Sequence, residues 1–334
     1  RFCAKVISKD GYLFPKYSAD GSWGSNAHSW ISPDGKFQLP IQEDETALVL
    51  YSLWNHYDHA RDIEFIDDLY DPLILKAADF LVNYRDDETK LPEPSYDLWE
   101  EQRGVSTFTA SAVCCGLMGA SRFAKLFGDS RKAERYKNAS EEIRSAILKH
   151  LYDPEKKRFL KMLHPDEEGD MRKDATVDSS LYAIFEFEVL PPDDPRVIST
   201  MNAIESNLWV RTKVGGIARY ENDPYQRISN DSAKVPGNPW PLCTLWLAEW
   251  YIANGDLQHG LKLLKWVADR GHESGILPEQ VNPETNEPLS VAPLTWSHST
   301  FVITVLEYLK KMRQEKNCPT CGLPAEKKKR GKLQ

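Results

Sequence analysis

The sequence predicts an all-α protein built from helical hairpins that close into a ring. Helical periodicity dominates the chain, and the signal for strands is slight. Strongly apolar helices alternate with polar ones. Long loops rich in aromatic residues precede the apolar helices, whereas short turns such as 128–129 and 254–256 precede the polar ones. Inner and outer helices joined in this way form an (α/α) toroid with its long loops at one end, and a flat helical solenoid is the alternative.

The N-terminal part of the chain contains long loops between its predicted helices. Residues 1–8 are expected to be the end of a helix, 12–44 a long irregular stretch, 46–59 an apolar helix, 73–84 a helix and 86–104 a second irregular stretch. Proline suits the first turn of a helix, so Pro72 is expected to open the helix that follows it. Loops as long as 12–44 usually carry function in a compact domain.

The middle and C-terminal parts repeat the alternation. Residues 107–126 are apolar on nearly all sides and are expected to be buried, whereas 130–151 are amphipathic and highly charged and are expected to lie outside. A small hairpin is expected at 158–175, helices at 177–187, 196–208, 242–253, 257–270 and 297–312, and irregular loops at 211–238 and 271–295.

Composition and charge narrow the class of function. The formal net charge of −8 makes nucleic acid an unsuitable partner. No apolar run reaches the roughly 18 residues that a membrane helix needs, so no membrane association is expected. The chain has 10 Trp, 14 Tyr and 12 Phe, many of them in loops, and such flat amphipathic rings suit the binding of sugar rings or other amphipathic ligands. The alternative is that a large core uses these rings.

The cysteines and the chain ends give two further expectations. The six cysteines show no disulfide framework, which favours a reducing, cytoplasmic location. No signal peptide is visible, and the chain opens without Met inside a predicted helix, so we expect that an N-terminal portion is missing. Residues 315–334 are expected to form a basic tail whose Cys318 and Cys321 are half a zinc site or have no metal role.

An acidic pair stands in the second long loop. Glu100 and Glu101 follow Trp99, and Asp97 and Arg103 lie within the same few residues. A carboxylic acid beside a bulky apolar ring keeps its proton to a higher pH, which makes it a candidate proton donor. The alternative is a solvated acidic loop.

A second isolated carboxylate, Glu279, stands in the last long loop. It follows Pro278 and precedes Trp296, which opens an apolar helix. Two loop carboxylates, each near a tryptophan, match the pairing that hydrolyses glycosidic bonds: one protonates the leaving oxygen and the other activates water or attacks carbon. By spacing alone the match is moderate, because many helical proteins carry loop glutamates.

Four short motifs in order make the resemblance specific. They read DLWEE at 97–101, GNPWPLCTL at 237–245, LPEQ at 277–280 and PLTWSH at 293–298, and PIQEDETA at 40–47 adds a fifth. With these motifs the chain, from residue 1 to about 312, resembles the catalytic domain of glycoside hydrolase family 15, the glucoamylase family, whose fold is an (α/α)6 barrel. The aromatic-Arg-Asp motif that this family carries before its second helix does not occur here.

The resemblance implies a role for each site residue. Glu100 would be the general acid and Glu279 the general base, with Glu101 and Arg219 holding sugar hydroxyls. The pocket walls would be Trp99, Trp240, Trp296 and, in a loop that does not align securely, Trp30 or Trp23. Without the motifs, Arg219 would be read as half of a surface salt bridge and Trp240 as a core residue at a helix entry. Family members invert the anomeric centre, for which the two carboxyl groups stand roughly 6.5–9.5 Å apart.

The resemblance also implies a function and a domain boundary. It implies an inverting exo-glucosidase that releases β-glucose from the non-reducing ends of α-glucans or malto-oligosaccharides, with no cofactor or metal. Glucodextranase and trehalase of the same family, and a non-catalytic carbohydrate-binding or regulatory barrel, are the alternatives. The barrel would occupy residues 1–314, with the first two helices and most of the third absent, which would leave one sector open. The oligomeric state is not predicted.

Overall fold

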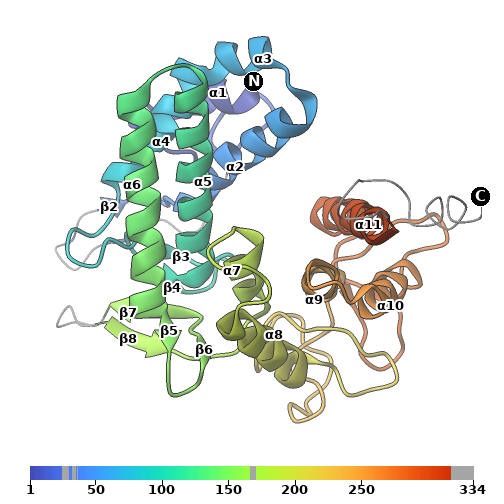
Figure 1. The fold of residues 1–334 in the computed structure, drawn as a ribbon. Coiled ribbons are helices and arrows are strands. Elements are labelled where there is room, and N and C mark those ends of the chain that lie inside the picture. The colour runs from blue at the N-terminus through green and yellow to red at the C-terminus, as the bar shows by residue number, and fades with distance from the viewer. Residues whose placement is uncertain (25–29, 32–34, 36, 166–170, 317–334) are drawn as a thin grey trace, which may run out of the picture. The chain divides into compact units, whose positions relative to one another are not determined.

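The computed structural model describes residues 1–24, 30–31, 35, 37–165 and 171–316, and these fold into two compact units (Figure 1). Unit 1 comprises residues 1–175 and 183–191, and unit 2 comprises residues 176–182 and 192 onwards. Helices dominate both units, as expected, and the strands are short.

Unit 1 is organised around α5, Thr107–Leu126, which is almost entirely buried. It packs against α2, Glu43–Ala60, on one side and against α6, Ser130–Ala146, on the other. Gly116 permits the close approach of α2, because a Cβ atom there would lie 2.7 Å from the carbonyl oxygen of Ala47. The other helical segments of this unit are α1 Phe2–Val6, α3 Ile63–Leu69, the π-helical turns η1 Tyr70–Leu75 and η2 Ile147–Leu151, α4 Lys76–Asn83 and α7 Ala183–Glu186.

A small antiparallel sheet closes one end of α5. Its strands, in spatial order, are β3 Ser95–Tyr96, β4 Arg103–Ser106, β7 Met162–Pro165 and β8 Met171–Asp174. Strand β4 runs directly into α5, and Ser106 caps that helix by accepting a hydrogen bond from the backbone N–H of Thr109. Two further strand pairs in this unit are β1 Trp30–Ile31 with β2 Phe37–Gln38, and β5 Tyr152–Asp153 with β6 Arg158–Phe159.

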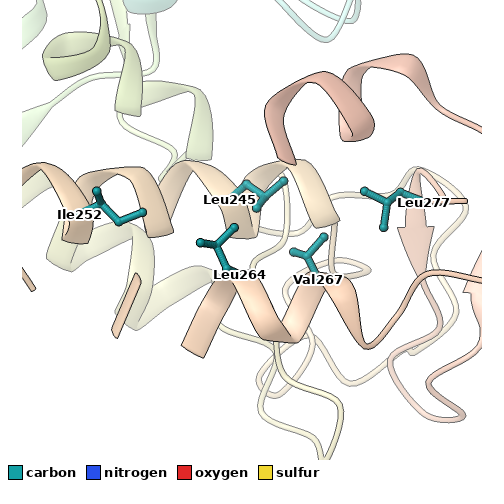
Figure 2. Packing of buried hydrophobic residues seen from close by; sticks show 5 residues of the cluster. All are labelled: Leu245, Ile252, Leu264, Val267 and Leu277. Carbon is teal, nitrogen blue, oxygen red and sulfur yellow. The ribbon is translucent and has the colours of Figure 1, made fainter. Parts of the chain in front are cut away.

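Unit 2 is organised around α9, Pro241–Ala253, which is apolar on all sides and buried. Five buried residues on α9, on α10 (Leu257–Ala268) and in the following loop form its core: Leu245, Ile252, Leu264, Val267 and Leu277 (Figure 2). The remaining elements of this unit are the 3-10 turn η3 Ser179–Tyr182, α8 Pro195–Leu208, the strand pair β9 Gln280–Val281 with β10 Pro288–Leu289, and α11 Thr295–Lys316.

The predicted elements agree with the structure at most positions. The helix at 107–126 and the helical run at 130–151 have the predicted bounds, the hairpin at 158–175 is present as β7 and β8, and inner and outer helices alternate within each unit. The prediction for Pro72 is wrong. The helical run begins at Ile63, and Pro72 lies inside the π-helical turn η1. The i→i+5 hydrogen-bond pattern of such a turn accommodates proline, which has no backbone N–H.

Candidate active site

Glu100 occupies the tip of the turn that joins β3 to β4. The two strands pair Tyr96 with Arg103, and the backbone N–H of Asp97 donates to the carbonyl of Gln102 at 2.8 Å. The N–H of Glu100 donates to the carbonyl of Asp97, also at 2.8 Å, which closes a tight turn. Glu100 has φ of 56°, in the left-handed region that few non-glycine residues adopt and that is often found at functional sites.

Asp97 fixes this turn from inside unit 1. One of its carboxylate oxygens accepts hydrogen bonds from the N–H groups of Glu101 at 2.9 Å and Gln102 at 3.2 Å. The other oxygen lies 3.1 Å from Nζ of Lys161, and both side chains are only 3% exposed. Lys161 stands directly before β7, so the ion pair ties the turn to the neighbouring strand of the sheet. Sequence reasoning missed Lys161, because nothing local links it to Asp97.

The three predicted residues of this turn differ in exposure. Trp99 is buried, Glu100 is half-buried and Glu101 is exposed. An ion pair joins Oε2 of Glu100 to Nζ of Lys16 at 2.8 Å. Lys16 belongs to the long loop before α2. This loop was expected to carry function, but the sequence did not single out Lys16.

A run of three acids opens α2 on the same unit. Burial, more than any other cause, raises the pKa of Glu43 to about 8, of Asp44 to about 7 and of Glu45 to about 8. The charge of Asp97 contributes to the shift of Asp44, and the charges of Asp44 and Glu100 contribute to that of Glu45. Near neutral pH this group of carboxyls therefore holds protons. This run belongs to the motif at 40–47, to which the sequence analysis gave no catalytic or binding role.

Arg219 lies in unit 2, where it is paired with Asp223 and packed among three aromatic rings. Its Nε and one terminal nitrogen each lie 2.7 Å from a carboxylate oxygen of Asp223, and both side chains are almost fully buried. The guanidinium carbon stands 5.1 Å from the ring centroid of Tyr220, 4.8 Å from that of Tyr225 and 5.1 Å from that of Trp240. The simple alternative of a surface salt bridge is therefore wrong for Arg219. Trp240 does stand at the entry of α9 and is buried.

Glu279 precedes β9 and is held by neutral groups. Its backbone N–H donates to the carbonyl of Val291 at 2.8 Å. Its Oε2 accepts a short hydrogen bond from the Ser290 hydroxyl and a longer one, at 3.4 Å, from the side-chain amide of Gln280. The Gln280 side chain is itself held by Nδ2 of Asn238 at 2.7 Å.

Three motifs distant in sequence meet around Glu279. The hydrogen bond between Asn238 and Gln280 joins the motif at 237–245 to the motif at 277–280. The N–H of Val281 also donates to the carbonyl of Pro239 at 2.9 Å. The motif at 293–298 joins them through Ser297, whose hydroxyl donates a hydrogen bond to the carbonyl of Pro278 at 3.0 Å. Unit 2 thus assembles the three C-terminal motifs into one hydrogen-bonded site.

Two predicted tryptophans remain to be placed. Trp296 opens α11, is half-buried and packs edge-to-face on Trp246 with ring centroids 5.8 Å apart. Trp30 lies in β1, and its side chain is outside the described residues. Glu100 and Glu279 belong to different units, so their predicted separation stays a prediction.

Within the described ranges, no group of three or more His, Cys, Asp or Glu side chains is placed to bind a metal ion. No described helix has the length and apolar character needed to cross a membrane. The pair at Cys318 and Cys321 lies outside the described residues.

The helical fold and the family match together place the chain among helical glycosidases. The family described as Glycosyl hydrolases family 15 matches residues 34–306, and the chain belongs to this family. It is 32% identical over 309 residues to an uncharacterised glycosyl hydrolase of Methanocaldococcus jannaschii, covering 87% of this chain and 45% of that protein. It is 27% identical over 329 residues to a glucoamylase of Clostridium sp., covering 90% of this chain and 42% of that protein.

Solved structures show the fold. A bacterial glucoamylase complexed with acarbose superposes with a TM-score of 0.73 at 23% identity, covering 93% of this chain and 45% of that one. A glucoamylase from Saccharomycopsis fibuligera superposes with a TM-score of 0.69 at 17% identity, covering 93% of this chain and 79% of that one. The fold is therefore that of the (α/α)6 barrel of family 15, as the sequence predicted. The chain spans less than half the length of the archaeal and clostridial relatives.

Proposed function

We propose that this chain is the catalytic part of an inverting exo-glucosidase that releases β-glucose from the non-reducing ends of α-glucans. Glu100 would donate a proton to the leaving oxygen, and Glu279 would activate the water that attacks the opposite face of the sugar. The observation that carries the proposal is that both carboxylates stand on firmly bonded turns: Glu100 on the turn fixed by Asp97, and Glu279 where three motifs meet.

The surroundings of each carboxylate support its role. A general base must be held in a fixed orientation, and the hydroxyl of Ser290 donates a hydrogen bond that orients the carboxyl group of Glu279. A general acid works protonated, and the carboxyl of Glu45 on the same unit, whose raised pKa reflects in part the charge of Glu100, belongs to the surroundings of this residue.

The other predicted residues would bind the sugar. Arg219, which is paired with Asp223 and packed among aromatic rings, would hold sugar hydroxyls. Glu101, which is exposed at the turn, would accept hydrogen bonds from further hydroxyls. Trp99, Trp240, Trp296 and Trp30 would supply apolar walls.

Trehalose is the competing substrate. The chain is 25% identical over 273 residues to Trehalase 2 of Sulfolobus acidocaldarius, so the family's fold and motifs are compatible with that activity as well. The two readings share the same acid and base and differ only in the sugar that the pocket accepts. A non-catalytic barrel is disfavoured, because both carboxylates are retained.

A substrate panel tests the proposal. The intact protein is incubated with maltotriose, isomaltose and trehalose, and released glucose is measured. We expect the highest kcat/KM on maltotriose. Preferential hydrolysis of trehalose would replace the proposed substrate but keep the mechanism. No hydrolysis of any of the three by a folded protein would contradict the proposal.

A further inference from the structure

The backbone just before Glu279 is bonded to a histidine side chain. The N–H of Leu277 donates a hydrogen bond to Nε2 of His298 at 2.9 Å, although 21 residues separate the two in sequence. Leu277 is buried in the core of unit 2 (Figure 2). A buried N–H that lacks an acceptor is costly, so this contact helps to fix the chain immediately before the proposed base.

Two carbonyls in the same stretch are bonded to the start of α11 as well. The carbonyl of Leu277 accepts a hydrogen bond from the N–H of Leu294 at 3.2 Å. The carbonyl of Pro278 accepts one from the hydroxyl of Ser297 at 3.0 Å. The residue that follows Pro278 is Glu279, so these contacts hold the chain on which the base is carried.

The N–H of Glu279 completes the series, because it donates to the carbonyl of Val291 at 2.8 Å. Proline has no N–H of its own. Every backbone polar group from the N–H of Leu277 to the N–H of Glu279 is therefore bonded to the segment 291–298. Three of the partners in that segment are backbone groups or a hydroxyl, and the fourth is the imidazole ring of His298.

The ring of His298 suits this contact by its chemistry and its reach. A ring nitrogen that accepts a hydrogen bond carries no proton, so Nε2 is the acceptor and the neutral ring has its proton on Nδ1. Lysine and arginine only donate, so they could not replace it. Glutamine carries an acceptor oxygen at the same number of bonds from Cα as Nε2. Asparagine carries the same amide on a shorter side chain.

We propose that His298 is a positioning residue for Glu279, an inference that rests on the proposed function. By accepting the N–H of Leu277, it sets the direction in which the chain enters Pro278. The φ angle of proline is fixed by its ring, so this direction passes on to Glu279 and to the place of its carboxyl group. A displacement of about 1 Å at a catalytic group can cost about a hundredfold in rate. His298 needs no contact with the sugar for this role, so its loss should act on kcat rather than on KM.

The test compares two amides at position 298. Both kinetic constants are measured on whichever of maltotriose, isomaltose and trehalose is hydrolysed fastest, and kcat is expressed per folded molecule from circular dichroism. His298→Asn does not reach Leu277, so kcat should fall about tenfold or more while KM changes less than about threefold. His298→Gln does reach, so it should keep kcat within about threefold of the wild type. If His298→Asn folds poorly, His298→Leu, which fills the space without an acceptor, replaces it and should show the same loss.

A double variant tests whether His298 acts through the base. In Glu279→Gln the base is already lost, so adding His298→Asn should lower kcat no further. A residue that only supports the fold of unit 2 would cause the same additional loss in this background as in the wild type.

His259→Asn is the matched control. His259 is an exposed histidine of α10, and its ring contacts Asp256 at the start of the same helix. Both kinetic constants of this variant should equal those of the wild type.

Three results would each overturn the inference: wild-type kcat in His298→Asn, an equal loss in His298→Gln, or an undiminished loss in the Glu279→Gln background. Wild-type activity in Glu279→Gln itself would instead overturn the proposed function.

Discussion

The turns that carry Glu100 and Glu279 are fixed by different kinds of bonds. Around Glu100 the partners are charged: a buried ion pair between Asp97 and Lys161 holds the turn, and Lys16 holds the side chain. Around Glu279 the partners are neutral: the hydroxyl of Ser290 and the amide of Gln280.

This difference matches what the two proposed roles require. A proton donor must regain its proton in every catalytic cycle, either from water or from a nearby acid. A carboxylate base must be ionised and must point toward the water molecule. Neutral hydrogen-bond donors in fixed positions can hold it in that orientation. We expect the alkaline limb of the pH profile to depend on unit 1 and the aim of the base to depend on unit 2.

Removing either carboxylate should give the largest loss. Glu100→Gln and Glu279→Gln should each lower kcat by about 10²–10⁴-fold, because each removes one step of proton transfer while preserving size. Steady-state kinetics on maltotriose, with circular dichroism to confirm the fold, measures this. A rate within threefold of the wild type for either variant would remove that residue from the mechanism.

Breaking the buried ion pair should cost stability as well as activity. Asp97→Asn removes a counter-charge from the buried Lys161, and breaking a buried ion pair by removing one partner costs about 3–5 kcal/mol of unfolding free energy. Urea denaturation measures the change. The double variant Asp97→Asn/Lys161→Met is the control: it removes both charges and should recover much of the loss. If the double variant is no more stable than Asp97→Asn, the ion pair is not the cause.

The acids that open α2 should make stability depend on pH. Glu43 is fully buried, and its folded pKa of about 8 lies above the unfolded value, so the folded state binds the proton more tightly. Its contribution to stability is complete below the unfolded pKa of 4.5, decreases as pH rises above that value, and is lost once pH has passed about 8. Glu43→Gln, which mimics the neutral form, should flatten the fall in unfolding free energy between about pH 4.5 and about pH 8. A parallel fall in both proteins would contradict the assignment.

Ser290→Ala should give the smallest of these effects. It removes one hydrogen bond to Glu279 but leaves the backbone of the turn and the Gln280 contact in place. A loss of one hydrogen bond to a charged group is worth about 1.5–3 kcal/mol, of which the remaining contact and water recover a part. We expect kcat to fall less than in Glu279→Gln. An equal loss would mean that Ser290 does more than hold the base.

The sequence predicted the helices well because their signals are local. The helix at Thr107–Leu126 is apolar on nearly all sides and is capped by a serine, and its bounds were predicted without error. Pro72 misled the prediction, because a proline at a helix start and a proline within a π-helical turn look alike in one sequence. The motifs located Glu100, Glu279 and Trp240, and the family resemblance added Arg219; the roles assigned to these residues stay predictions.

The partners of the site residues could not be predicted in the same way. Lys161 is 64 residues from Asp97, and Lys16 is 84 residues from Glu100, and lysines of this kind are frequent on any surface. The bond between Asn238 and Gln280 links two motifs that the sequence showed only in order. Such contacts depend on how the helices bring the loops together, and only the folded chain provides that.

The most direct test of the central claim is the configuration of the first glucose released. Proton NMR during the first minutes of maltotriose hydrolysis by the intact protein distinguishes the two anomers before they interconvert. Glu100 as acid and Glu279 as base acting through water predict that β-glucose appears first and α-glucose follows only by mutarotation. Initial release of α-glucose would contradict the account, because it would require a carboxylate that attacks the sugar rather than a base that activates water.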